Sequence, residues 1–111
     1  MKKIAALLTI ILLSNTAFAL DAAGDGGWIS VGVPNFIHIG TSGKFYLNGS
    51  DQGSCANVKP QYIRIDMAAT HFKEFYSWLL FMSAQKKEIS CTVSHGCGQS
   101  EVWTTYCRGS L

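Results

Sequence analysis

The chain has 111 residues, of which 48% are hydrophobic and 14% charged, and its formal net charge at pH 7 is +2. Domains that bind nucleic acid carry a basic stripe that neutralises phosphates, and this sequence has none. A chain of this length holds one small domain and leaves no room for a second. We therefore expect a single domain that does not bind nucleic acid.

The N-terminal segment has the three parts of a secretory signal peptide. Lys2 and Lys3 precede an apolar run at residues 4–13, and a small-x-small cleavage motif follows at residues 17–19. The apolar run is shorter than the roughly 20 residues of a membrane-spanning helix. We predict that residues 1–19 are removed and that the mature domain, residues 20–111, is secreted or periplasmic without a membrane span. Seven basic residues then face seven acidic ones, so the mature net charge is zero.

Three strands are predicted in the first half of the mature chain. Residues 28–39 alternate imperfectly and are interrupted at Gly32 and Pro34, which indicates one long strand with a bulge or bend. A turn at residues 40–43 and a strand at residues 44–47 complete a hairpin. The clearest strand is residues 61–66, whose strict alternation places Tyr62, Arg64 and Asp66 on one face.

A helix is predicted at residues 68–85, because the apolar period changes there to three and four. The stripe consists of Phe72, Phe75, Tyr76, Leu79 and Leu80. Asp66 or Thr70 is a candidate cap for its start. A second apolar set lies around toward the other side and comprises Trp78, Phe81 and Met82. Deeper burial at this end of the helix and packing against another subunit both explain this set, so a homo-oligomer interface is one of two open hypotheses.

Two closing strands are predicted at residues 88–93 and 102–107. The resulting order of strand, strand, strand, helix, strand, strand predicts an α+β fold. We expect a small five-stranded antiparallel sheet or barrel with one helix between strands 3 and 4.

All four cysteines lie in the mature domain, and an even number in a small exported domain predicts two disulfides. A hairpin centred near Gln99 places Cys91 opposite Cys107 and leaves Cys97 at its tip. The remaining partner for Cys97 is then Cys55. Four cysteines allow three connectivities. We favour the one that consists of these two pairs, and the other two connectivities stay open.

The hairpin tip, Ser94-His95-Gly96-Cys97-Gly98, is also where catalysis or metal binding has to be considered. A zinc site would use Cys91, His95, Cys97 and Cys107, and a nucleophile pair would use Cys97 with His95, but both need free thiols in an oxidising compartment. No serine nucleophile elbow or phosphate-binding glycine loop is present either. We expect no enzyme activity, no metal and no cofactor.

Aromatic side chains are the remaining candidates for a binding site. Flat rings that could contact a sugar or a protein partner are those of Trp28, Tyr46, Trp103 and Tyr106, with Tyr62 as a further one. Polar groups near loop tips that could assist them are Asn48, Gln52 and Gln99. Such rings also serve as ordinary core residues in a small barrel.

The predicted order of elements is that of an OB-fold and resembles the exported B subunits of pentameric AB toxins. It also resembles a set of small exported bacterial proteins that have a cysteine in the second loop, then a helix and a cysteine-containing hairpin. Here these features are Cys55, the helix from His71 to Lys86, and Cys97. The likeness to the toxins implies a ring of subunits that binds host glycans. No glycan-contacting residue matches position by position, and the pair Cys91 and Cys107 is extra to both patterns.

These observations predict a secreted or periplasmic, non-catalytic module that binds a glycan or a protein. Two alternatives stay open. One is a small secreted enzyme or enzyme inhibitor that uses the hairpin loop of His95 and Cys97, and the other is an envelope-maintenance protein.

Overall fold

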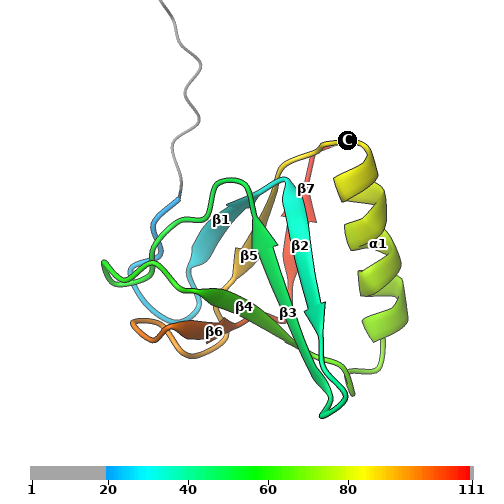
Figure 1. Cartoon of the computed structure of the whole chain (residues 1–111). Coiled ribbons are helices and arrows are strands. Elements are labelled where there is room, and N and C mark those ends of the chain that lie inside the picture. Colours follow the sequence, from blue (N-terminus) through cyan, green and yellow to red (C-terminus); the bar gives the residue numbers. More distant parts are fainter. Residues whose placement is uncertain (1–19, 111) are drawn as a thin grey trace, which may run out of the picture.

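A computed structural model describes residues 20–110, so the predicted signal peptide at residues 1–19 lies outside the described residues. Residues 20–110 form seven strands and one helix: β1 (Trp28–Gly32), β2 (Pro34–Ile39), β3 (Lys44–Gly49), β4 (Tyr62–Asp66), α1 (Phe72–Ala84), β5 (Ile89–Thr92), β6 (Glu101–Trp103) and β7 (Cys107–Gly109). They make one sheet of order β1-β5-β7 and a second of order β2-β3-β4-β6 (Figure 1). The predicted α+β class with one helix is confirmed.

The expected count of five antiparallel strands in one barrel is wrong for these residues, because two of the predicted strands are divided between the two sheets. The first of them becomes β1, which pairs with β5, and β2, which pairs with β3. Gly32 stands at the division with a φ of 79°, and a Cβ there would lie 2.5 Å from the Asp51 backbone nitrogen. The bend predicted at Gly32 and Pro34 is therefore present, and it is sharp enough to pass the chain from one sheet to the other.

The last predicted strand is divided in the same way. Its first part, β6, pairs in parallel with β4, and its second part, β7, pairs antiparallel with β5. The break between them is held by Thr104, which is buried and whose Oγ1 accepts a hydrogen bond of 3.4 Å from the Tyr106 backbone nitrogen. At each of these two breaks the chain passes from one sheet to the other, but the two sheets do not close into one barrel.

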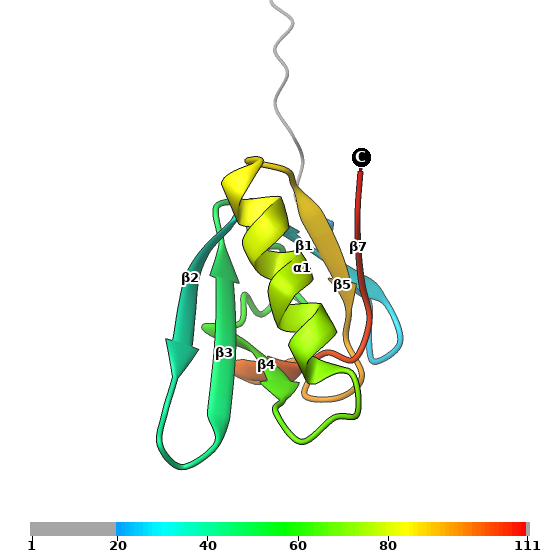
Figure 2. The same cartoon turned by 90° about the vertical axis from the view of Figure 1, so that its right-hand side faces the viewer.

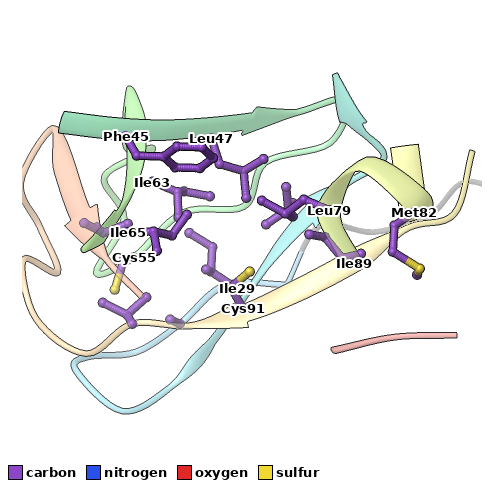
Figure 3. Close-up of a cluster of buried hydrophobic side chains, with 14 residues drawn as sticks. Ile29, Phe45, Leu47, Cys55, Ile63, Ile65, Leu79, Met82, Ile89 and Cys91 are labelled. Atoms are coloured by element: carbon purple, nitrogen blue, oxygen red, sulfur yellow. The ribbon is translucent and has the colours of Figure 1, made fainter. Parts of the chain in front are cut away.

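One hydrophobic core lies between the sheets and the helix (Figure 3). Its strand residues alternate with outward-facing ones, as the predicted period of two requires: Phe45 and Leu47 on β3, and Ile63 and Ile65 on β4, are buried. Full burial of one such side chain contributes roughly 1.5–3 kcal/mol. The core therefore fixes which face of each strand points outward.

Figure 2 shows how α1 lies across the molecule, and all of the predicted stripe except Leu80 packs on the core, with Trp78 and Met82 in addition. Leu79 and Met82 are fully buried, whereas Leu80 is 47% exposed and Phe81 50% exposed. Residues three apart share a helix face, and each single step turns by about 100°, so Leu80 and Phe81 rotate away from the face of Leu79 and Met82. The prediction that Leu80 faces the core is wrong.

The predicted caps of the helix are also absent. His71 occupies the N-cap position and makes no side-chain cap bond. Asp66 instead accepts a hydrogen bond of 2.9 Å from the Ala68 backbone nitrogen in the preceding turn.

No helix within residues 20–110 is long and apolar enough to cross a membrane.

The two disulfides join Cys55 to Cys97 and Cys91 to Cys107, which are the favoured pairs. Cys91 and Cys107 are register partners on β5 and β7, as the hairpin argument predicts. Cys55 lies in the loop after β3 and ties it to the tip of the hairpin. The tip turns at Gly96 and Gly98, which both have a positive φ.

Candidate functional site: the outer face of the four-stranded sheet

Five outward-facing side chains form one row across the sheet β2-β3-β4-β6. His38 is the register partner of Tyr46, Tyr46 of Arg64, and Arg64 of Trp103, and Trp103 forms a further bridge to His95. Adjacent strands lie about 4.8 Å apart, so five such positions span roughly 19 Å. We call these five residues the sheet-face row.

The side chains of the sheet-face row pack against one another rather than standing free. The guanidinium carbon of Arg64 lies 4.2 Å from the ring centroid of Trp103, and the His95 ring is stacked on Trp103 with centroids 5.1 Å apart. At the other end, the His38 ring meets the edge of Tyr46 at 6.4 Å, and Tyr62 is stacked on Tyr46 at 4.6 Å. The rings of the row are therefore held in place by one another, by Arg64 and by Tyr62.

Glu101 on β6 ties the row together electrostatically. Arg64 Nη1 donates a bond of 3.0 Å to Glu101 Oε2, and the Tyr46 hydroxyl donates a bond of 3.1 Å to Glu101 Oε1. Burial acts to raise the pKa of Glu101, but the hydrogen bonds from Arg64 and Tyr46 and the charges of Arg64 and Lys44 outweigh it, so the pKa is lowered. Burial and the bond to Glu101 raise the pKa of Tyr46. An ionised carboxylate therefore orients a cation and a neutral phenol on this face.

Two of the polar side chains considered for ligand binding are engaged inside the protein. Asn48 Nδ2 donates to Gln52 Oε1 at 2.8 Å and to the Gln61 carbonyl at 2.7 Å, and Asn48 Oδ1 is 3.1 Å from His38 Nε2. Gln52 Nε2 donates to the Pro60 carbonyl at 3.0 Å. These amides fix the loop after β3 and position His38, so they offer few bonds to a ligand.

The structure separates the four predicted aromatic ligand residues into two places. Tyr46 and Trp103 belong to the sheet-face row. Trp28 and Tyr106 pack against each other at the three-stranded sheet with centroids 5.7 Å apart, and Arg108 lies 4.1 Å from the Trp28 ring. The four rings therefore do not form one site.

The predicted interface set on the helix is also divided. Met82 is fully buried in the core and offers nothing to another subunit, which corrects its place in that set. Phe81 is exposed and Trp78 is half-buried, so an exposed apolar surface on α1 consists of these two residues with Leu80.

Sequence reasoning did not single out His38 or Glu101. It considered His95 only for the chemistry of the hairpin loop, and it placed Arg64 on a strand face without assigning it to a site. The alternation of β4 did place Tyr62 and Arg64 on one face, which was the available signal. The partners of Arg64 in the site, Glu101 and Trp103, both lie on β6. Glu101 is 37 residues further along the chain, and the parallel pairing of β4 with β6 brings it next to Arg64. No local pattern encodes that pairing.

The cysteine chemistry considered for the hairpin is not assembled. Cys91, Cys97 and Cys107 are all in disulfides, so they supply neither zinc thiolates nor a nucleophile. Across the described residues, no three His, Cys, Asp or Glu side chains gather as a metal-binding group. The His95 ring packs on Trp103 instead of facing a thiol.

Comparison of the chain with protein families, with curated proteins and with solved structures returned no match.

Proposed function

We propose that this protein is an exported, non-catalytic binding module and that the sheet-face row is its recognition surface for another protein. The row itself is the observation that carries the proposal: His38, Tyr46, Arg64, Trp103 and His95 stand side by side on one outward face. Tyr, Trp and Arg are the residues enriched at the centres of protein interfaces, where they dominate binding energy.

The rigidity of the row supports this proposal. Binding costs roughly 0.5–1.5 kcal/mol for each flexible side chain that it immobilises. Arg64 is already held between Glu101 and the Trp103 ring, and Tyr46 between Glu101 and the Tyr62 ring. A partner therefore meets groups whose rotamers are fixed before it arrives.

A glycan is the second candidate partner, and the connectivity of the strands favours it. The bent run β1–β2, the parallel pairing of β4 with β6 and the division of β6 from β7 support an OB-like arrangement. OB-folds bind oligosaccharides on the face of their second and third strands, which here correspond to β3 and β4 under the row. This candidate keeps the proposed likeness to toxin B subunits.

Two disulfides in a domain of this size support an oxidising compartment, in keeping with export. The enzyme alternative at the hairpin loses its nucleophile, since Cys97 is bonded to Cys55. His95 then serves the binding surface.

Site-specific photocrosslinking tests the proposal. A photoreactive phenylalanine replaces His38, His95 or, as control, Ala84, which is exposed on the helix on the opposite side of the sheet. We expect a discrete adduct with the same protein from both row positions in the cell that makes the chain or in its target, and none from position 84. Adducts from position 84 alone, or none from either row position together with an empty glycan array, would contradict the proposal.

A matched pair of arginines controls for general loss of structure. Arg64 and Arg108 each lie over a tryptophan ring, at 4.2 and 4.1 Å, but Arg108 lies away from the row. Arg64→Ala should reduce the adduct yield at least fivefold, whereas Arg108→Ala should leave it unchanged. Oligosaccharide binding that is lost in Arg64→Ala, without any protein adduct, would select the glycan candidate instead.

A further inference from the structure

The first half of α1 lies next to the segment that joins β6 to β7 (Figure 2). Residues of both segments line a groove of about 560 Å³. Its volume falls within the range of pockets that hold small molecules. The groove opens on the helix side of the molecule, so it shares no residue with the sheet-face row. A ligand in the groove therefore contacts a different surface from the proposed protein partner.

The walls of the groove are mainly apolar and aromatic. Phe72, Phe75 and Trp78 recur at a spacing of three and line it from the helix, with the Phe75 and Trp78 rings 5.9 Å apart. Ile65 and Thr104, both buried, form part of the opposite side. These helix rings are half-buried, which leaves part of their apolar surface open to a ligand.

The rim of the groove carries negative charge. Two carboxylates, Asp66 and Glu74, line it, and none of its lining residues is Lys or Arg. Asp66 is partly engaged by the Ala68 backbone nitrogen and has Lys44 as its register partner. The Glu74 side chain is 73% exposed and lies 3.8 Å from Nδ1 of His71, which also lines the groove. Glu74 is therefore the carboxylate best placed to meet a ligand.

We propose that this groove binds a small ammonium compound with an aromatic or branched aliphatic body. The ammonium group pairs with Glu74 at the rim, and the apolar body lies against Phe75 and Trp78. The same rings attract a cation through their faces. An anion of equal size fits the groove but is repelled by Asp66 and Glu74, so the charge of the ligand decides binding.

Three compounds of similar shape and different charge test this proposal: 2-phenylethylammonium, 2-phenylethanol and 3-phenylpropionate. Each is titrated into the oxidised protein while backbone amide NMR shifts are recorded. We expect the ammonium compound to shift the amides of Phe75, Trp78 and Thr105, with a Kd at least threefold lower than that of the alcohol. The carboxylate should bind more weakly than the alcohol.

Glu74→Gln removes the charge at an exposed position and keeps the shape, so the fold is preserved. It should raise the Kd of the ammonium compound by about three- to tenfold and leave that of the alcohol unchanged. Glu88→Gln, an exposed acid outside this groove, is the matched control and should change neither.

Three results would overturn the proposal: equal binding of all three compounds, no shift at these amides up to 10 mM of the ammonium compound, or the same shifts appearing with rising protein concentration alone. The last result would assign the groove to a second copy of the chain. None of them bears on the crosslinks from His38 and His95, so the two proposals fail separately.

Discussion

Glu101 is the residue through which protonation acts on the sheet-face row. Its ionised carboxylate accepts bonds from both Arg64 and Tyr46, and its pKa is lowered in the folded protein. A lowered pKa stabilises the fold at every pH above the ordinary pKa of a glutamate. That contribution is lost as the pH falls through the lowered value.

Glu101→Gln should therefore reduce the free energy of unfolding by about 1–2 kcal/mol at pH 7. The difference from wild type should begin to shrink as the pH falls below the ordinary glutamate pKa of about 4.3, and it should approach zero only below the lowered pKa of Glu101, where the wild-type carboxyl is neutral as well. Urea unfolding at a series of pH values measures this. Glu74→Gln, at a mostly exposed position, serves as the control with little change. A difference that persists unchanged at pH 2 would show that charge has no part in the role of Glu101.

Gly32 tests the bend that passes the chain between the sheets. It combines a φ of 79° with a Cβ position only 2.5 Å from a backbone nitrogen, whereas Gly43 has a φ of 88° and nothing within 4 Å. Gly32→Ala should lower the free energy of unfolding by more than 2 kcal/mol, and Gly43→Ala by about 1 kcal/mol, since only the first adds a steric clash to the backbone cost. Chemical denaturation compares the two. Equal losses would mean that the contact at Gly32 relaxes freely.

At the scale of elements, the sequence predicts what depends on local periodicity. The alternation of residues 61–66 places Ile63 and Ile65 inside and Tyr62 and Arg64 outside, and β4 has that arrangement. The division of the last strand was not predictable, because it depends on Thr104 being buried and on β6 leaving β5 to pair with β4. The apolar residues of the helix are likewise compatible with either of two buried faces. Packing against strands that are distant in the sequence determines which face is buried.

Substitutions at two neighbouring residues test which face of the helix is buried. Met82 is fully buried and Phe81 is 50% exposed. Met82→Ala should cost about 2–5 kcal/mol of unfolding free energy because it leaves a cavity, whereas Phe81→Ala should cost less than about 1 kcal/mol in a monomer. Denaturation midpoints at two protein concentrations measure both. If Phe81→Ala costs more at the higher concentration, then this residue lies in an interface between copies.

At the scale of the whole molecule, the candidate site depends on pairings that the sequence does not display. Tyr46 and Trp103 were selected as aromatic residues, but the row becomes visible only when β2, β3, β4 and β6 are placed in register. The cysteines are the exception among long-range contacts. Their pairing follows from one hairpin register and from elimination, since each cysteine has only three possible partners.

The two disulfides hold different parts of the molecule, and their removal should have different consequences. Cys55–Cys97 closes a separation of 42 residues and anchors the hairpin tip next to His95, whereas Cys91–Cys107 closes 16 residues and fastens β7 to β5. From loop length alone, their contributions are about 4 and about 3 kcal/mol. Both bridges therefore contribute on the scale of the whole stability of a small domain.

Hydrogen exchange on the two double variants separates these roles. In Cys55→Ala/Cys97→Ala, the amides of Ser94 and Trp103, which bond across the hairpin, should exchange faster, while the amide of Cys91 stays protected. In Cys91→Ala/Cys107→Ala, the amides of β5 and β7 should exchange faster and the stacked pair His95 and Trp103 should persist. The first variant should also lose crosslinking at position 95 but not at position 38, because only one end of the sheet-face row depends on the tip. If both variants instead lose protection across the entire domain, the domain is one cooperative unit that needs both disulfides. The Cys55–Cys97 bridge would then not act locally on the His95 end of the row.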